Sequence, residues 1–340
     1  MMGGDQILES GERSDAETEW VTSIARNNPH IFGKKGMWEI SAVEEPQVSS
    51  HNTRLYMVDG TGVHIKFFKK TLGRINPTYT PCREMESEHK MLKEYESRGF
   101  STGKHRVVVP LGTNSDLDCA LATVYVGGKP LLSIIQEVIG QGRNPGDLYI
   151  GLDLAAGLLK KIHTVMPGTP RIDNSETFFS CLKSILYLEE QDSLGGYHRR
   201  IMKGLTRWYN YKPLYDQAGV TIHGDANPSN FKIDSGVIYA FDVERSRPRR
   251  SPVYDLGTMA AELKHQFTYM GHSGARSEPY IEHFLRSYCS DEEEFSMVTA
   301  LLPFYMSQSL FRIAMLGYWK GNHKRYLIEE GTRCMEVRPE

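Results

Sequence analysis

The chain of 340 residues contains no apolar run long enough to cross a membrane, and its first residues lack the basic and apolar regions of a secretory signal peptide. It also has little net charge: 40 lysines and arginines stand against 42 aspartates and glutamates, which gives no reason to expect a nucleic-acid partner. We therefore expect a cytoplasmic protein without membrane or nucleic-acid partners. The oligomeric state does not follow from the sequence.

Cysteine is scarce, and the five cysteines show no metal-site spacing, which suits a reducing compartment: Cys82, Cys119, Cys181, Cys289 and Cys334. Internal repeats and low-complexity tracts are absent as well. The chain is long enough to bury a sizeable core. Residues 1–20 are polar, and we expect them to form a disordered tail.

Polar residues gather in one stretch, His-Gly-Asp-Ala-Asn-Pro-Ser-Asn at residues 223–230. Short apolar segments at 220–222 and 231–233 flank it, and a third at 237–241 leads into Asp242. These segments have the length and composition of strands. A loop held between strands can aim several polar side chains at one point.

Three side chains of this region suit phosphoryl transfer. Asp225 is placed to accept the proton of a hydroxyl group, while Asn230 and Asp242 supply the hard oxygen ligands that Mg²⁺ prefers. His223 is expected to brace the backbone rather than to react. A single aspartate in such a loop is more often a turn residue, so the interpretation depends on the full set and its spacing.

The region from Asp225 to Asp242 resembles the aminoglycoside phosphotransferases, choline kinases and related small-molecule kinases, which share the protein-kinase-like fold. The resemblance implies an α+β, bilobal molecule. Residues 21–126 would form a small N-lobe with an antiparallel sheet and one helix, and residues 127–340 a larger, mostly helical C-lobe. It further implies ATP or another nucleoside triphosphate, Mg²⁺, and a lysine and a helical glutamate upstream.

The lysine is found at Lys66. Residues 54–58 and 63–68 are strand-like, and period-two alternation puts Lys66 on the face opposite Ile65 and Phe67. An edge-strand lysine that discourages aggregation is the ordinary alternative. The resemblance implies instead that Lys66 contacts nucleotide phosphates.

The glutamate is found in residues 82–97, where helical periodicity aligns four residues along one side: Met85, Glu88, Leu92 and Tyr95. A carboxylate in an apolar stripe is costly unless it is paired, and Lys66 is the natural partner of Glu88. Glu84 and Glu86 are competing candidates, although a solvated acidic face explains them.

The phosphate-covering loop departs from the protein-kinase pattern, because no G-x-G-x-x-G lies between the strand-like residues 38–43 and Arg54. Ser49 and Ser50 stand there and resemble the serine-containing loops of aminoglycoside phosphotransferases, which implies hydrogen bonds to phosphate. An ordinary polar turn is an equal alternative.

Two further assignments rest mainly on the resemblance. It implies that the backbone of Val124 to Val126, before the flexible pair at residues 127–128, contacts adenine. Asp255 is expected to cap a helix, and the resemblance adds that it braces the catalytic loop. His163 is interpreted as a helix-end histidine that interacts with the helix dipole.

The spacing favours a small-molecule acceptor. Two amphipathic stretches, residues 176–191 and 195–217, precede the catalytic loop where a protein kinase has only a few residues, and Asn227 occupies the place of the lysine of Ser/Thr kinases. The expected acceptor is a hydroxyl of a sugar, amino alcohol, nucleoside or antibiotic. A protein Ser/Thr kinase and a nucleotide-binding pseudokinase that regulates a partner are the alternatives.

Four arginines follow Asp242: Arg245, Arg247, Arg249 and Arg250. Guanidinium forks bind phosphate and carboxylate, which favours an acceptor with an acidic group, whereas a solvated basic loop is the alternative. Glu189, Glu190 and Asp192 would reverse this inference if they lined the pocket.

Overall fold

The computed structural model describes residues 10–43, 51–71, 79–316, 319 and 321–338. The chain divides into two compact units. The N-terminal unit contains the residues up to 101 together with 107–127, and the C-terminal unit contains residues 102–106 and 128–340.

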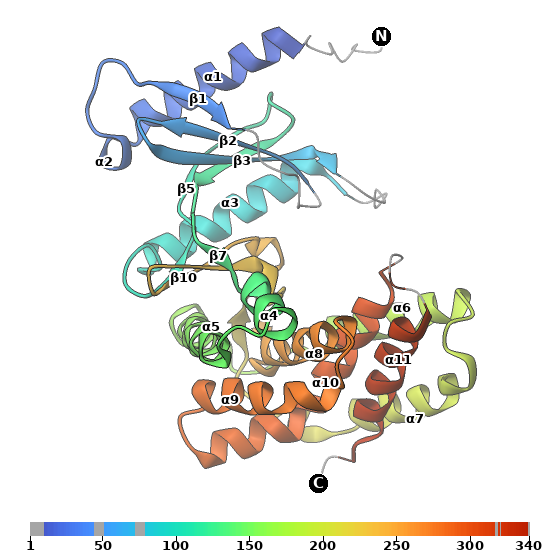
Figure 1. The fold of residues 1–340 in the computed structure, drawn as a ribbon. Coiled ribbons are helices and arrows are strands. Elements are labelled where there is room, and N and C mark those ends of the chain that lie inside the picture. The colour runs from blue at the N-terminus through green and yellow to red at the C-terminus, as the bar shows by residue number, and fades with distance from the viewer. Residues whose placement is uncertain (1–9, 44–50, 72–78, 317–318, 320, 339–340) are drawn as a thin grey trace, which may run out of the picture. The chain divides into compact units, whose positions relative to one another are not determined.

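The N-terminal unit is built on a five-stranded antiparallel sheet (Figure 1). Across the sheet, the strands follow the order β1 (Ile40–Val43), β2 (His51–Val58), β3 (Thr61–Thr71), β6 (Ala120–Val124) and β5 (Pro110–Asn114). Asp59 and Gly60 join β2 to β3 with φ values of 48° and 84°, which is the left-handed geometry of a two-residue hairpin. The two strands contain the segments that the alternating pattern predicted.

Three helices accompany this sheet: α1 (Ser10–Asn27), α2 (Pro29–Phe32) and α3 (Pro81–Ser97). Val21 and Ile24 of α1 share one apolar cluster with Ile65 and Phe67 of β3, and α3 lies on the opposite face (Figure 1). The alternation of β3 therefore sends its apolar side chains toward α1 and Lys66 toward α3.

Helix α1 corrects the prediction of a disordered tail over residues 1–20, because the helix begins at Ser10. Glu17 is fully buried, and its carboxylate accepts hydrogen bonds from Arg54, at 2.8 Å, and from the Tyr56 hydroxyl, at 2.7 Å. Polar composition alone suggested disorder, but the helix is anchored by the paired Glu17 and, just beyond residue 20, by the buried Val21 and Ile24. Residues 1–9 lie outside the described part of the chain.

A disulfide joins Cys82, near the start of α3, to Cys119, which directly precedes β6. It corrects the interpretation of the cysteines as a scattered set typical of a reducing compartment. The two residues are 37 positions apart in sequence, but α3 packs on the sheet and brings their Cα atoms to 5.0 Å. Cys181, Cys289 and Cys334 are free.

The C-terminal unit contains two small sheets. One has the order β4 (His105–Val107), β10 (Val237–Ala240), β9 (Phe231–Asp234) and β7 (Lys129–Pro130), and the other pairs β11 (Arg247–Arg250) with β8 (Val220–Ile222). The connection between β8 and β9 is the polar stretch 223–230, so the strands predicted around it are present.

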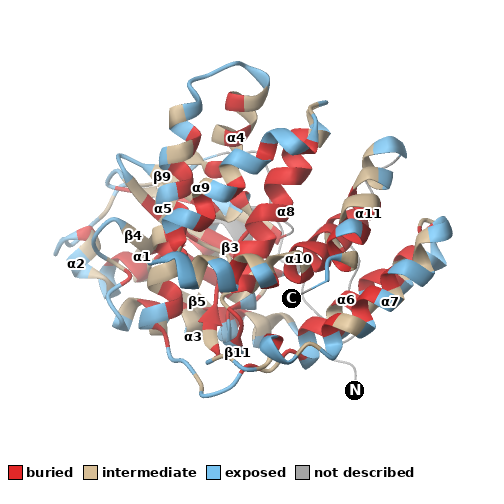
Figure 2. Cartoon of the chain, turned by 90° about the horizontal axis from the view of Figure 1, so that it is seen from below, coloured by how far each residue is buried: buried red, intermediate tan, exposed pale blue. Residues whose placement is uncertain are grey.

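Helices make up most of the C-terminal unit: α4 (Leu131–Gly140), α5 (Pro145–Val165), α6 (Ser175–Glu190), α7 (His198–Tyr209), α8 (Val253–Tyr269), α9 (Glu278–Tyr288), α10 (Glu292–Ala314) and α11 (Gly321–Glu336). Helix α8 is buried along nearly its whole length (Figure 2) and packs against α4, α9, α10 and α11. Helices α6 and α7 confirm the two predicted amphipathic stretches. In the described residues, no helix is long and apolar enough to span a membrane.

Candidate active site

The pairing of Lys66 with Glu88 is confirmed. Lys66 Nζ on β3 lies 2.9 Å from Glu88 Oε2 on α3, and both side chains are buried. The buried residues of α3 are Met85, Glu88, Leu92 and Tyr95, the stripe that the helical period predicted. The ion pair selects Glu88 over Glu84 and Glu86. It satisfies two charges that burial would otherwise make costly.

The other predicted nucleotide contacts have different outcomes. Ser49 and Ser50 lie outside the described residues, and β2 begins at His51. Val124 is the last residue of β6, and its backbone N–H donates to Val109 O at 2.9 Å, so this N–H already has an acceptor. Val126 follows two residues later. Contact of Val124 and Val126 with adenine stays a prediction.

Hydrogen bonds to the backbone connect the loop at residues 223–230 internally and to the segment before Asp242. Asn230 Nδ2 donates to the carbonyl of Asp225 at 3.0 Å, and the carbonyl of Asn230 accepts from the N–H of Phe241, the residue before Asp242. Asn227 caps the short 3-10 helix η3 (Pro228–Asn230) by accepting from the N–H of Ser229. Asn230 is therefore linked both to Asp225 and to Phe241, the residue before Asp242.

Asp255 braces this loop from α8. Its Oδ2 accepts from the N–H of His223 at 2.7 Å and its Oδ1 from the N–H of Gly224 at 2.9 Å. Gly224 has φ 85°, and a Cβ there would lie 2.1 Å from Arg245 O, so glycine is required. The bracing role implied by the resemblance is thus present, whereas Asp255 lies inside the first turn of α8 rather than at its cap.

The histidines act as structural links. His223 Nδ1 accepts from the N–H of Asp225 at 3.3 Å, and its Nε2 lies 3.2 Å from Phe241 O. His163 is buried, with Nε2 at 3.0 Å from Asp255 Oδ2 and Nδ1 at 2.9 Å from the Tyr288 hydroxyl. The helix-dipole interpretation of His163 is therefore replaced by a role in orienting Asp255.

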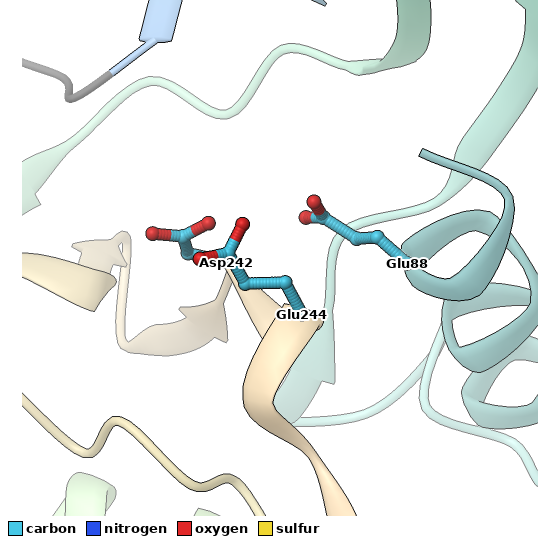
Figure 3. Close-up of side chains that lie close together, drawn as sticks. All are labelled: Glu88, Asp242 and Glu244. Carbon is cyan, nitrogen blue, oxygen red and sulfur yellow. The ribbon is translucent and has the colours of Figure 1, made fainter. Parts of the chain in front are cut away.

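Asp242 begins the 3-10 helix η4 (Val243–Arg245) in a left-handed conformation, with φ 61°. Its carboxylate and that of Glu244 have oxygens within 4.8 Å of each other and project on the same side of the turn (Figure 3). Two carboxylates at this separation form a donor set suited to Mg²⁺. Sequence reasoning missed Glu244, although its position two residues after Asp242 was a visible signal.

Arg312 of α10 is a second residue that the sequence did not reveal. Its guanidinium donates to Asp225 Oδ1 at 2.8 Å, and the two side chains are 21% and 19% exposed. The available signal was weak: an arginine in an otherwise apolar run of α10, which requires a partner. No local pattern names that partner, because Asp225 lies 87 positions earlier.

Among known proteins, no family model and no curated sequence matches the chain. Solved structures do. One is a putative aminoglycoside phosphotransferase of Ralstonia eutropha, which is 14% identical in sequence and has a TM-score of 0.59. The match covers 95% of this chain and 98% of the phosphotransferase. An ethanolamine kinase of Plasmodium vivax is 15% identical with a TM-score of 0.54 over 98% and 96%. An aminoglycoside phosphotransferase solved with ADP is 11% identical with a TM-score of 0.52 over 97% of each chain.

The chain has the fold of the aminoglycoside phosphotransferase and choline kinase-like kinases. The predicted α+β fold is therefore confirmed, with an antiparallel sheet and helices first and a mostly helical part after it. The loop that follows β8 carries Asp225 and Asn230, and the turn that follows β10 carries Asp242, so their predicted place beside strands is confirmed, while their roles stay predictions.

The four arginines that follow Asp242 differ in burial. Arg250 is buried and pairs with Glu176 of α6 and with the carbonyl of Asp173, so it has a structural role. The other three are exposed: Arg245, Arg247 and Arg249. The acidic residues that would have reversed the inference are exposed too, and Glu189 pairs with His198 at 3.3 Å.

Proposed function

We propose that the chain is an ATP- and Mg²⁺-dependent kinase that phosphorylates a hydroxyl group of a small molecule. The supporting observation is the catalytic loop itself: Asp225 and Asn230 are tied to each other, Asn230 to the segment before Asp242, and the whole loop to Asp255. These bonds hold Asp225 and Asn230 in a fixed relation to each other, as a base and a metal ligand of one site require. Two matched phosphotransferases were solved with ADP and with ATP, respectively.

In the proposed reaction, Asp225 accepts the proton of the acceptor hydroxyl. The oxygen then bonds to the γ-phosphorus of ATP, the bond from that phosphorus to the bridging oxygen breaks, and ADP leaves with the electron pair. Positioning and neutralisation of charge supply most of the acceleration. Lys66, held by Glu88, contributes a positive charge to the nucleotide phosphates.

Asn230 and Asp242 are the residues proposed to hold Mg²⁺, and Glu244 adds a third oxygen donor. The amide and carboxylate oxygens form the hard donor set that this ion requires. When bound, the ion would neutralise the phosphate charge that develops during transfer. Asn230, at the end of η3, and Asp242, at the N-cap of η4, would hold the ion.

The acceptor is proposed to be a small molecule of the sugar, amino alcohol, nucleoside or antibiotic type. The matched structures include a putative fructosamine-3-kinase, a glucosamine kinase and an ethanolamine kinase, whose names cover several of these classes. Helices α6 and α7 stand before the catalytic loop, where a protein kinase has almost no chain. Protein Ser/Thr kinase activity is therefore the weaker alternative.

The test is turnover of ATP with a panel of hydroxylated acceptors, compared between the wild-type chain and Asp225→Asn. Removal of the base should lower kcat by roughly 10²- to 10⁴-fold. Asp234→Asn is the matched control, because Asp234 is an exposed aspartate at the end of β9 in the same unit, and it should leave kcat unchanged. Equal turnover by wild type and Asp225→Asn would show that Asp225 is not the base. Nucleotide binding without turnover of any acceptor would favour a pseudokinase.

A further inference from the structure

Arg312 stands in the apolar part of α10, directly after the buried residues Leu310 and Phe311. A charged side chain in such a place is costly unless a partner of opposite charge compensates it. The packing of α8 on α10 sets its location: Thr258 Oγ1 and Ser309 Oγ lie 3.1 Å apart, one turn before Arg312. Two packed helices, rather than a surface loop, therefore place the guanidinium.

The Asp225 carboxylate receives this guanidinium at one oxygen only. Its backbone is already fixed, because the Asp225 N–H donates to His223 and the Asp225 carbonyl accepts from Asn230. Among the residues that the structure describes, Arg312 is the side chain that donates to the carboxylate, and the bond is to Oδ1. Oδ2 remains to accept a proton.

The surroundings keep Arg312 charged. Burial alone would lower the pKa of its guanidinium, but Asp225 in the first place, and then Tyr254 and Glu262, raise that pKa above its ordinary value. Tyr254 and Glu262 both lie on α8, the helix that packs against α10. A charged donor forms a stronger hydrogen bond than a neutral one and so holds the Asp225 carboxylate in one rotamer.

We infer that Arg312 is a positioning residue, which holds Oδ1 of Asp225 and thereby aims Oδ2 at the acceptor hydroxyl. The inference rests on the proposed function, since it gives Arg312 a role only through the base. A misplacement of about 1 Å at a reacting group costs on the order of 10²-fold in rate, so the loss of this hydrogen bond should appear in kcat.

The experiment measures kcat and KM for ATP and for the acceptor in Arg312→Ala, Arg312→Lys, Asp225→Asn and the Arg312→Ala/Asp225→Asn double variant. Arg312→Ala should lower kcat roughly 10- to 100-fold and leave KM for ATP within about twofold. Arg312→Lys should recover part of kcat, because lysine supplies the charge without the planar fork. In the Asp225→Asn background, loss of Arg312 should have no further effect, as expected for two groups that act as a unit.

Two controls separate positioning from general damage. Arg286→Ala removes an exposed arginine of α9 that also pairs with carboxylates, and it should leave kcat unchanged. Added guanidinium ion should restore part of the kcat of Arg312→Ala and none of the kcat of Asp225→Asn. If Arg312→Ala does not fold, Arg312→Lys takes its place. Its kcat should then be below that of wild type, and the lysine should have no further effect on kcat in the Asp225→Asn background.

The outcomes are distinct. If Asp225→Asn loses turnover while Arg312→Ala and Arg312→Lys keep full kcat, the positioning role is wrong and the proposed function stands. If Arg312→Ala lowers kcat equally with and without Asp225, its effect is structural and the inference is overturned. If wild type and Asp225→Asn turn over ATP equally with every acceptor and with water, the proposed function fails, and the role of Arg312 fails with it.

Discussion

Lys66 and Glu88 form a buried ion pair, with Nζ and Oε2 2.9 Å apart and side chains that are 10% and 5% exposed. The pair connects β3 to α3 across a distance of 22 residues in the sequence. Removal of one partner takes the nearest opposite charge away from a buried charged side chain, which is more damaging than removal of both.

We therefore expect Glu88→Gln to lower the free energy of unfolding by about 3–5 kcal/mol. The double variant Lys66→Met/Glu88→Leu should be less destabilised than the sum of the two single changes. Urea unfolding at equilibrium measures both. The exposed pair of Lys93 and Glu96 on the same helix is the matched control, and its loss should cost less than about 1 kcal/mol. Additive effects of the two buried substitutions would contradict the coupling.

The disulfide determines how many cysteines a thiol reagent can label. With the chain unfolded and no reductant present, a maleimide should label three cysteines, Cys181, Cys289 and Cys334. After reduction it should label five, since Cys82 and Cys119 are released. Mass spectrometry of the intact chain distinguishes the two results. Five labels without reductant would show that Cys82 and Cys119 are thiols under the conditions of purification.

Loss of the brace at Asp255 should loosen the catalytic loop. In Asp255→Ala, the buried N–H groups of His223 and Gly224 lose their acceptor, and each unsatisfied group costs about 1–3 kcal/mol. Thermal unfolding should show this loss, and hydrogen exchange of the two amides should accelerate. Asp153→Ala, an exposed aspartate of α5 that pairs with His283, is the control and should leave both amides protected. Unchanged exchange at residues 223 and 224 would refute the bracing role.

Glu262 should make stability depend on pH. Burial, partly opposed by Arg312, raises the pKa of this carboxyl from 4.5 to about 7. The folded chain therefore holds a proton that the unfolded chain has lost between about pH 4.5 and 7, so stability contributed by this group falls as pH rises through that window and is lowest above it. The total effect is about 3 kcal/mol, from about 1.4 kcal/mol for each pH unit.

Glu262→Gln should remove this dependence. Relative to wild type, the variant should gain stability between pH 5 and pH 8 in urea unfolding, because glutamine carries no charge to bury. Glu293→Gln, at an exposed position of α10, serves as the control and should follow the wild-type curve. A stability difference between wild type and Glu262→Gln that does not change with pH would show that Glu262 does not titrate in this window.

The part of the site that could be predicted from sequence is the part that local pattern determines. Asp225 and Asn230 stand in one short loop between strands, and the period of β3 and α3 is enough to point Lys66 and Glu88 at each other. Glu244 was equally local but was overlooked.

The rest depends on how distant elements pack. Arg312 meets Asp225 only because α10 lies against α8, and Cys82 meets Cys119 only because α3 lies on the sheet. The sequence does not distinguish Arg250 from the three exposed arginines beside it, because its burial depends on the pairing with Glu176 of α6. The composition of residues 1–20 led to a wrong prediction for α1 for the same reason. The apolar side of this helix is narrow, and it is buried only because the helix packs on the sheet.

The burial of Glu17 bears on how the protein is handled in the laboratory. A shortened version that starts at the first strand would uncover the apolar face of β3 and leave Arg54 and Tyr56 without the carboxylate that they share. Such a product would aggregate through that uncovered face, and its inactivity would say nothing about catalysis. Expression plasmids should therefore retain the residues from Ser10 onward.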